Sequence, residues 1–305
     1  MLAIAGDSAA GKTTLTRGLV QCLGADRMTA VCVDDYHRFD RAERRDKPFT
    51  ALHPDCNHIE IMEQHLQLLA MGEPVLKPVY DHATGELVRP QLVEPRDFVI
   101  VEGLLPLHTR MARACFDVTV YLDPPEALRH QWKIDRDCGK RGYTAEQVRA
   151  ELERREPESA AFIRPQRRFA DLVVRFAQVA DRSDPPDTPL SAELLLRPTI
   201  DHPSLAEVLD DAEHRAMHLR LRRDTDGLPV DALHVHGYVS PEESEILKKA
   251  IWERLWEESP SAGGPADLPR SLGRLTEGGE TNDPLAITQL LLLYHLLNAD
   301  HRRAA

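Results

Sequence analysis

Several features that would place a protein in a specialised class are scarce in this 305-residue chain. The five cysteines are an odd number without CxxC spacing, which argues against a disulfide framework and against a zinc site. No apolar run approaches the roughly 18 residues of a membrane-spanning helix, and no basic and apolar signal segment precedes the first predicted strand. We therefore expect a cytoplasmic protein with free thiols and no membrane contact.

Positive charge in excess is also missing. The formal net charge is −12, and a general nucleic-acid binder needs a basic face, so we expect no nucleic-acid partner. The 42% of hydrophobic and 29% of charged residues are ordinary for a globular protein, and the length fits one large domain or two modest ones.

A phosphate-binding loop stands at the start of the chain. The run Gly6-Asp7-Ser8-Ala9-Ala10-Gly11-Lys12-Thr13 fits GxxxxGK[ST], follows the apolar segment 1–5 and precedes a helix-compatible stretch. We expect this run, together with Thr14, to bind the nucleotide. The two glycines allow backbone N–H groups to point at an anion, and the following helix adds its positive dipole end. Lys12 can reach the β- and γ-phosphates, and the Thr13 hydroxyl can ligate Mg²⁺. Because both flanks agree, a chance Gly-Lys-Thr turn is the weaker interpretation, and we expect ATP and Mg²⁺ as cofactors.

Short apolar runs alternate with segments of helical periodicity. The runs span residues 29–33, 98–101, 116–122 and 170–176, and helical segments are predicted at 59–71 and 145–154. This alternation predicts an α/β fold, a P-loop NTPase-like and mainly parallel sheet flanked by helices. Ligands of such sheets bind beyond the carboxyl ends of the strands, so residues just after each strand are the first candidates.

Carboxylates follow two of the predicted strands. Asp34 and Asp35 come after the second strand, and Glu102 ends the third. Glu102 is at the position from which an acid holds the Mg²⁺ shell in nucleotide-binding sheets, although a solvated strand end is the alternative. Strand alternation sends one aspartate toward the crevice and one away, and spacing alone does not say which.

A charged cluster falls in a stretch that reads as helix. Lys133, Arg136, Asp137 and Arg141 are spaced so that most of their side chains share one helical side. A solvated amphipathic face is the usual interpretation of such a cluster. The competing interpretation is a lid that supplies cations to the γ-phosphoryl oxygens.

A family resemblance emerges from these residues taken together. Over about the first 176 residues the chain resembles phosphoribulokinases in the segments GDSAAGKTT, VCVDDYHRFDR, TALHPD, KPVYDH, FVIVEGLLPLH, YLD, WKIDRD and IRPQRRFAD. The segments TALHPD and KPVYDH make it more similar to the plant and cyanobacterial type than to the purple-bacterial type. The resemblance implies that ATP phosphorylates O1 of ribulose 5-phosphate to give ribulose 1,5-bisphosphate, and it suggests a homodimer whose small-molecule partner is this sugar phosphate.

Roles are implied only for matching positions. Asp34 resembles the general base for the O1 hydroxyl, and Lys12 belongs to the catalytic phosphate loop. The metal-side residues implied are Thr13, Glu102 and Asp137, and the lid cations are Arg136 and Arg141 with Lys133 nearby. The sugar-phosphate side of the pocket is implied for His37, Arg41, Arg45, Tyr80 and His82. Arg41 and Arg45 are four apart, so both guanidinium groups can grip one phosphate from a single helical turn.

The chain departs from the plant pattern at two of these places, and two other functions stay open. Arg45 stands where the plant type has lysine, and Asp81, to which we assign no role, stands where it has asparagine. One alternative is a uridine kinase-type nucleoside kinase. Arg41 and Arg45 argue against it because they suit a phosphorylated acceptor, and only 5% of the residues are aromatic and could stack a base. The other is a nucleotide-binding scaffold without turnover, which predicts decay of the base or lid positions.

The C-terminal part carries no predicted catalytic residue. With a linker at Asp181–Pro189, we expect a P-loop kinase core over residues 1–180 and an α+β extension packed on it over 190–305. Antiparallel strands are predicted at 190–196, 217–223 and 230–235, and helices at 241–258 and 284–301. His234 and His236 alternate on one of these strands, and two histidines without a third ligand are more often surface residues than a metal site.

Thiol regulation gives a first test. Light-regulated plant forms pair a cysteine inside the phosphate loop with one just before the two aspartates, and this chain has Cys32 at the second place but Ala10 at the first. We therefore expect activity to be unchanged by dithiol reagents acting through this pair. Several-fold activation by reduced thioredoxin in a kinase assay would contradict the prediction.

Overall fold

The computed structural model describes the chain except for residues 180–184, 186–187, 203–215, 259–266, 276–278 and 305. The described residues divide into two compact units. The first contains Met1–Lys12 and Asp26–Ala170, and the second contains Thr13–Ala25 and Asp171–Ala305. The predicted linker at Asp181–Pro189 lies mostly outside the described residues, and each unit is treated by itself below.

Four parallel strands form the centre of the first unit. β1 (Leu2–Gly6) lies between β5 (Phe98–Gly103) and β6 (Val118–Leu122), and β2 (Met28–Cys32) pairs with the other side of β5. Every residue of β1, β5 and β6 is buried, which explains why these strands read as continuous apolar runs in the sequence. The parallel sheet predicted from those runs is confirmed for these four strands.

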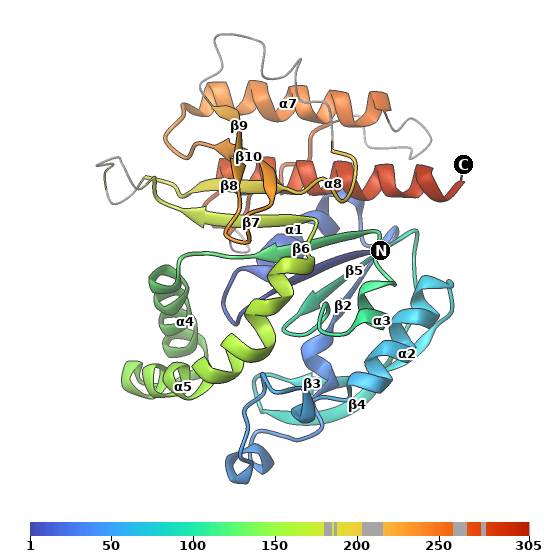
Figure 1. The fold of residues 1–305 in the computed structure, drawn as a ribbon, viewed down its shortest axis with the longest axis vertical. Coiled ribbons are helices and arrows are strands. Elements are labelled where there is room, and N and C mark those ends of the chain that lie inside the picture. Colours follow the sequence, from blue (N-terminus) through green and yellow to red (C-terminus); the bar gives the residue numbers. More distant parts are fainter. Residues whose placement is uncertain (180–184, 186–187, 203–215, 259–266, 276–278, 305) are drawn as a thin grey trace. The chain divides into compact units, whose positions relative to one another are not determined.

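Two helices cover β2 and β5. α2 (Ile59–Ala70) and the short α3 (Arg110–Arg113) lie beside these strands in Figure 1. Met62 and Leu66 of α2 join Val31 of β2 and Val101 of β5 in one buried apolar cluster. This cluster packs α2 against β2 and β5, so the carboxyl ends of these strands are held in position.

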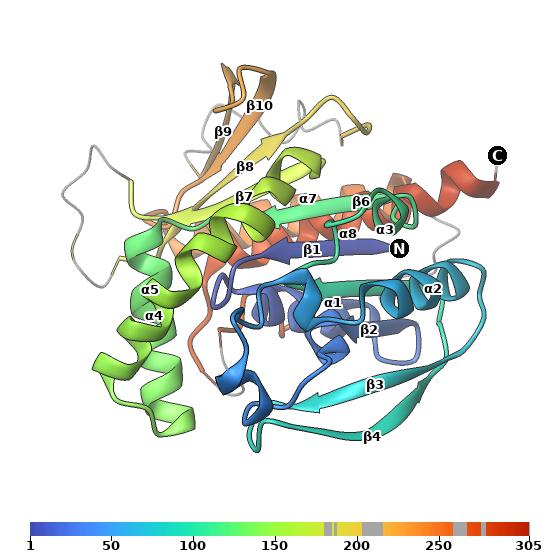
Figure 2. The ribbon, with the colours of Figure 1, turned by 60° about the horizontal axis from the view of Figure 1, so that its bottom comes forward.

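Two further helices follow β6. α4 (Glu126–Arg141) and α5 (Ala145–Glu158) lie side by side, as Figure 2 shows. Thr144 starts α5 with a capping box, and the chain then continues through a π-helical turn, η4 (Ser159–Ile163), and a 3₁₀ segment, η5 (Arg164–Phe169). The helices predicted around 133–141 and 145–154 are confirmed.

A separate hairpin completes the first unit. β3 (Val75–Asp81) and β4 (Glu86–Val93) form a two-stranded antiparallel sheet that the apolar runs did not predict. Three short 3₁₀ segments stand between β2 and α2, namely η1 (Val33–Tyr36), η2 (Glu43–Asp46) and η3 (Pro54–Cys56). The hairpin contacts η1, which brings Tyr80 close to the residues that follow β2.

The strands of the second unit are antiparallel. They pair in the order β7 (Leu172–Ala177), β8 (Ser191–Leu196), β10 (Pro229–Val235) and β9 (Met217–Arg223), which confirms the three strands predicted there. The apolar run at residues 170–176 corresponds to β7, which pairs antiparallel with β8. A strand buried between neighbours has the same apolar sequence whichever direction its partner runs, so the apolar run did not reveal the direction.

The described part of this unit contains three helices. α1 (Lys12–Leu23) begins at the phosphate loop, and the two C-terminal helices α7 (Pro241–Glu258) and α8 (Asp283–Ala304) confirm the predicted ones. Residues 284–297 of α8 are nearly all buried, which explains the four consecutive leucines from Leu290. Among the helices that the structure describes, none is both long and apolar enough to cross a membrane.

His234 and His236 lie against a third histidine. His218 of β9 stacks between them, with ring centroids 4.7 Å from His234 and 4.8 Å from His236. All three rings are half-buried. Among the described residues, no group of three or more His, Cys, Asp or Glu side chains has an arrangement that fits a metal ion.

The end of α4 offers a matched pair of glycines. Gly139 lies inside the helix, where an added Cβ would meet open space, whereas Gly142 caps the helix in the left-handed region at φ 71°. We expect Gly139→Ala to raise the free energy of unfolding by about 0.5–1 kcal/mol and Gly142→Ala to lower it by about 1 kcal/mol. Denaturant unfolding measures both, and two changes of the same sign would contradict this account of the helix end.

Candidate active site

The phosphate loop connects β1 to α1. Gly6 ends β1 beside β6, where a Cβ would meet the Leu122 carbonyl oxygen at 2.9 Å, so only glycine fits there. Ala9 has a positive φ of 66°, a conformation that costs a non-glycine residue energy. The Lys12 ammonium is buried and donates to the carbonyl oxygens of Gly6 and Asp7, both at 3.0 Å. The loop is therefore closed around its own lysine at the start of a helix, the arrangement that suits a phosphate group.

Strand register brings the acids to the same edge as this loop. β5 pairs with β1 on one side and β2 on the other, with Glu102 opposite both Ile4 and Cys32. Glu102 is buried at the end of β5, and Asp34 follows β2 within η1. Both carboxylates thus lie where the strands of the parallel sheet end.

The contacts of Asp34 and Asp35 separate the two aspartates. Asp35 accepts hydrogen bonds from the buried Lys77 ammonium and, at 3.0 Å, from the Tyr80 backbone N–H, so it ties the hairpin to η1. Asp34 accepts one bond at Oδ1, from the Leu104 N–H at 2.8 Å. Its Oδ2 accepts no hydrogen bond from the part of the chain that the structure describes.

Aromatic residues from η1 and the hairpin pack near Asp34. The rings of His37 and Tyr80 meet edge to face at 4.8 Å, and those of Tyr80 and His82 at 5.1 Å. Burial lowers the pKa of His37 to about 4, with the charge of Arg44 adding to the effect, and the Asn57 amide oxygen lies 2.7 Å from Nδ1. His37 is therefore neutral at pH 7. Burial also lowers the pKa of His82, and the Arg141 and Arg136 charges add to this against the opposing charge of Asp34.

The arginines on the segment between η1 and η3 differ in their contacts. Arg41 donates to the His82 carbonyl oxygen at 2.6 Å and so holds the hairpin turn. Arg45 is exposed, and its guanidinium makes no hydrogen bond or ion pair to any described residue. Arg44, which the sequence pattern did not single out, donates to the Tyr80 hydroxyl at 2.5 Å and lies over its ring. A contact to an aromatic residue on another element has no signal in the sequence.

The charged cluster of α4 converges on one carboxylate. Asp137 is buried, and nitrogens of Lys133, Arg136 and Arg141 lie 2.5, 2.9 and 3.3 Å from its oxygens. Burial alone would raise the pKa of Asp137, but hydrogen bonds from Arg136 and Lys133 lower it to about 2. Burial and the nearby Arg155 charge lower the pKa of Lys133 to about 8, against the effect of Asp137. The cluster is thus an organised group of cations rather than a solvated helix face.

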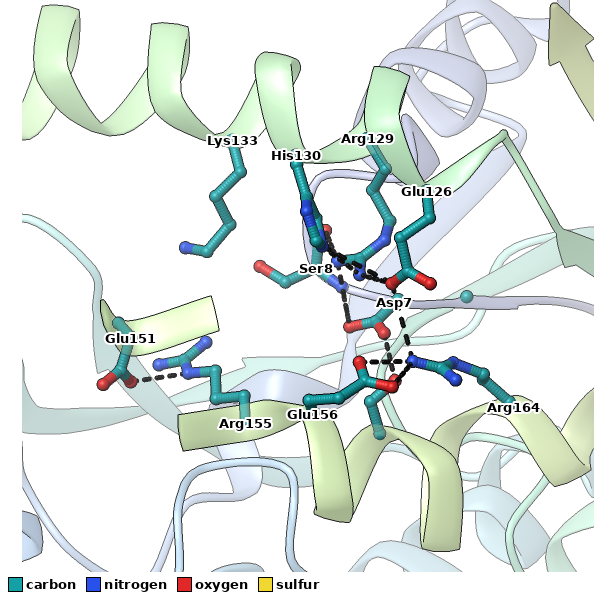
Figure 3. Close-up of polar contacts among 12 residues, drawn as sticks. Asp7, Ser8, Glu126, Arg129, His130, Lys133, Glu151, Arg155, Glu156 and Arg164 are labelled. Carbon is teal, nitrogen blue, oxygen red and sulfur yellow. Dashed lines mark hydrogen bonds and ion pairs between the residues drawn. The ribbon is translucent and has the colours of Figure 1, made fainter. Parts of the chain in front are cut away.

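A second charged network lies against the phosphate loop, shown in Figure 3. The Asp7 carboxylate contacts Arg129 of α4 and Ser159 of η4, and Arg129 also contacts Glu126. Arg164 of η5 in turn pairs with Glu126 and Glu156. No role was predicted for these partners from the sequence, although a buried acid inside a phosphate loop needs a compensating cation, and Glu126 and Arg129 have the i, i+3 spacing of a helical pair.

Cys32 lies at the end of β2 beside these acids. Burial raises the pKa of its thiol well above the usual value, and the charges of Asp34 and Glu102 raise it further. All five cysteines are free. The thiolate that disulfide exchange requires is therefore disfavoured at Cys32.

The two aspartates provide a stability test. In Asp35→Asn the Lys77 ammonium, 4% exposed, loses its counter-charge, so we expect a loss of about 3–5 kcal/mol in the free energy of unfolding. In Asp34→Asn the amide oxygen can still accept from the Leu104 N–H, so we expect a change within about 1 kcal/mol. Urea unfolding of both variants measures the difference, and equal losses would show that the two contacts do not separate the aspartates.

Comparison with known proteins agrees with this geometry. The profile of the Phosphoribulokinase / Uridine kinase family matches residues 1–183. A phosphoribulokinase of Synechocystis sp. is 41% identical over 175 residues, which are 57% of this chain and 53% of that protein. The chloroplastic phosphoribulokinase of Arabidopsis thaliana is 35% identical over 191 residues, covering 57% of this chain and 48% of that protein. This chain thus spans about half the length of the phosphoribulokinases it matches.

Two other relatives extend the comparison. A uridine kinase of Chloroflexus aurantiacus is 32% identical over 179 residues, covering 57% of this chain and 85% of that protein. The solved phosphoribulokinase from Rhodobacter spheroides has a TM-score of 0.59 at 18% identity, over 85% of this chain and 98% of that one, which shows a shared fold. With its phosphate loop, strand-end acids and helix-borne cations all inside the matched region, the chain belongs to the Phosphoribulokinase / Uridine kinase family.

Proposed function

We propose that this chain transfers the γ-phosphoryl group of ATP to O1 of D-ribulose 5-phosphate, giving D-ribulose 1,5-bisphosphate and ADP. The observation that carries the proposal is Asp34. Its carboxylate lies at the same end of the parallel sheet as the phosphate loop. Oδ1 accepts a hydrogen bond from the Leu104 N–H, and Oδ2 accepts none within the described chain. The relatives named phosphoribulokinase support this acceptor over others.

In the proposed reaction Asp34 is the general base. Oxygen O1 attacks the γ-phosphorus, the bond from that phosphorus to the β,γ-bridging oxygen breaks, and ADP leaves with the electron pair. Asp34 takes the hydroxyl proton from O1 as the new bond forms. Phosphoryl transfer otherwise needs mainly the alignment of the reactants and the neutralisation of charge.

Cations of the loop and of α4 neutralise the transferred group. We propose that Lys12 contacts the β- and γ-phosphates and that Arg136 and Arg141, with Lys133 nearby, reach the γ-phosphoryl oxygens. Asp137 keeps these three cations together before substrate binds, which limits its freedom to ligate a metal ion as well. Glu102 and Thr13 are the other residues we propose to hold Mg²⁺, which would supply positive charge to the phosphates.

The acceptor would bind between the hairpin and the segment that follows β2. Arg45, whose guanidinium has no partner among the described residues, suits the dianionic 5-phosphate. Arg45 lies in η2, and Arg41 lies in the turn before it. The neutral His37 ring and the rings of Tyr80 and His82 would face the sugar. From the family resemblance we also propose a cytoplasmic homodimer.

A uridine kinase-type activity is the second candidate. It is favoured by the match to a uridine kinase, which covers 85% of that protein, against about half of each phosphoribulokinase. Arg41 and Arg45 argue for a phosphorylated acceptor instead. A scaffold without turnover is the third possibility, and the intact Asp34 and α4 cations argue against it.

Acceptor specificity tests the proposal. We expect Mg²⁺-dependent release of ADP with ribulose 5-phosphate and little with uridine, and Asp34→Asn should lower kcat roughly 10²–10⁴-fold because the base is removed. Asp97→Asn, an exposed aspartate paired with Arg27 at the opposite end of β5, is the matched control and should keep wild-type activity.

The other outcomes separate the alternatives. Turnover of uridine but not of ribulose 5-phosphate would assign a nucleoside kinase. Binding of ATP without turnover of either acceptor would favour the scaffold. Full activity of Asp34→Asn on ribulose 5-phosphate would keep the reaction but overturn the base assignment.

A further inference from the structure

Asp7 is a buried acid in a loop that has to bind polyphosphate. Its side chain is 10% exposed, and its carboxylate accepts from the Ser8 N–H at 2.7 Å and from the Ser159 hydroxyl. A carboxylate in this position repels an incoming phosphate group unless a cation compensates for it. Lys12 does not contact this carboxylate, since its ammonium is bonded to the loop carbonyl oxygens.

Arg129 of α4 supplies the compensating charge. Its side chain is 7% exposed, and Nη1 lies 3.6 Å from Asp7 Oδ1 and 3.3 Å from the Ser8 carbonyl oxygen. Figure 3 shows its guanidinium beside the backbone of Ser8, with the Asp7 carboxylate close by. One guanidinium therefore neutralises the acid and holds the carbonyl next to it.

The rest of the network holds Arg129 in place. Nη2 donates to Glu126 Oε1 at 2.6 Å, and the same oxygen lies 3.4 Å from His130 Nε2 and 3.5 Å from Arg164 Nη2. Burial alone would raise the pKa of Glu126, but the hydrogen bond from Arg129 and the charge of Arg164 lower it overall, so Glu126 stays ionised. Arg164 is 40% exposed and pairs directly with Glu126 and Glu156, whereas it acts on Asp7 only as a charge without direct contact.

We propose that Arg129 is a positioning residue for the nucleotide. It cancels the Asp7 charge and holds the Ser8 carbonyl oxygen toward α4, so that the loop N–H groups stay turned toward the phosphates. The guanidinium acts through Asp7 and Ser8 and does not itself bind the nucleotide. The inference rests on the proposed function only as far as nucleotide binding, and it is independent of the acceptor.

Removal and rescue of the charge test this inference. The affinity of Mg²⁺-ADP is measured by calorimetry without any acceptor, for the wild type, Arg129→Met, Asp7→Asn and the double variant. We expect Arg129→Met to weaken binding roughly tenfold or more, because a buried carboxylate is left unpaired beside the phosphates. The double variant should return to within about threefold of the wild type, because neither charge remains to be compensated.

Arg164→Met is the matched control. It removes a guanidinium from the same network without touching the loop, and affinity should stay within about threefold of the wild type. A double variant that binds as weakly as Arg129→Met would overturn the proposal and indicate direct contact between Arg129 and the nucleotide. An equal loss in Arg164→Met would overturn it as well, by showing a general effect of the network.

Folding is monitored by circular dichroism. If Arg129→Met alone does not fold, the double variant decides: affinity within about threefold of the wild type supports the proposal, and a loss of roughly tenfold overturns it. Because no acceptor is present, failure of ribulose 5-phosphate turnover would overturn the proposed function while these affinities still decide the role of Arg129.

Discussion

Parallel pairing of β2, β5 and β1 is the constraint on which the candidate site depends. The register sets Glu102 opposite both Ile4 and Cys32, so the phosphate loop after β1, the acid at the end of β5 and Asp34 after β2 all emerge at one edge. The strands can hold that register because they are buried and because α2 packs on β2 and β5. A shift of one residue would turn every side chain of a strand to its other face, and the apolar packing prevents it.

Charge at this edge is organised in pairs before any substrate is bound. Asp35 holds Lys77, Asp137 holds three cations of α4, and Asp7 holds Arg129. Burying a charge is costly unless a partner and hydrogen bonds compensate for it, so each pair fixes the geometry of two elements at once. Asp35 fastens the hairpin to η1, and Asp7 fastens the phosphate loop to α4 and η4. In an acidic chain, the cations near the phosphate loop are thus kept in defined places.

Two charged groups of the candidate site are not held by contacts of this kind. Oδ2 of Asp34 and the guanidinium of Arg45 have no partner among the described residues, whereas the neighbouring Asp35 and Arg44 are held by contacts. Groups that bind or react with a substrate have to be available to it, while groups that position others are used within the fold. The contrast between neighbours in the chain therefore supports separate roles for Asp34 and Asp35.

Local spacing and periodicity were enough to predict the phosphate loop, the buried parallel strands, most helices and the acids at the strand ends. The family resemblance, also read from the sequence, ranked Asp34 over Asp35, a choice that strand alternation left open. The remaining features could be seen only in the folded chain. The direction of β7, the β3–β4 hairpin and the contacts of Arg44 and Arg129 join segments far apart in the chain, where spacing carries no information. The convergence of three cations on Asp137 likewise depends on rotamers and burial, which a helical spacing permits but does not specify.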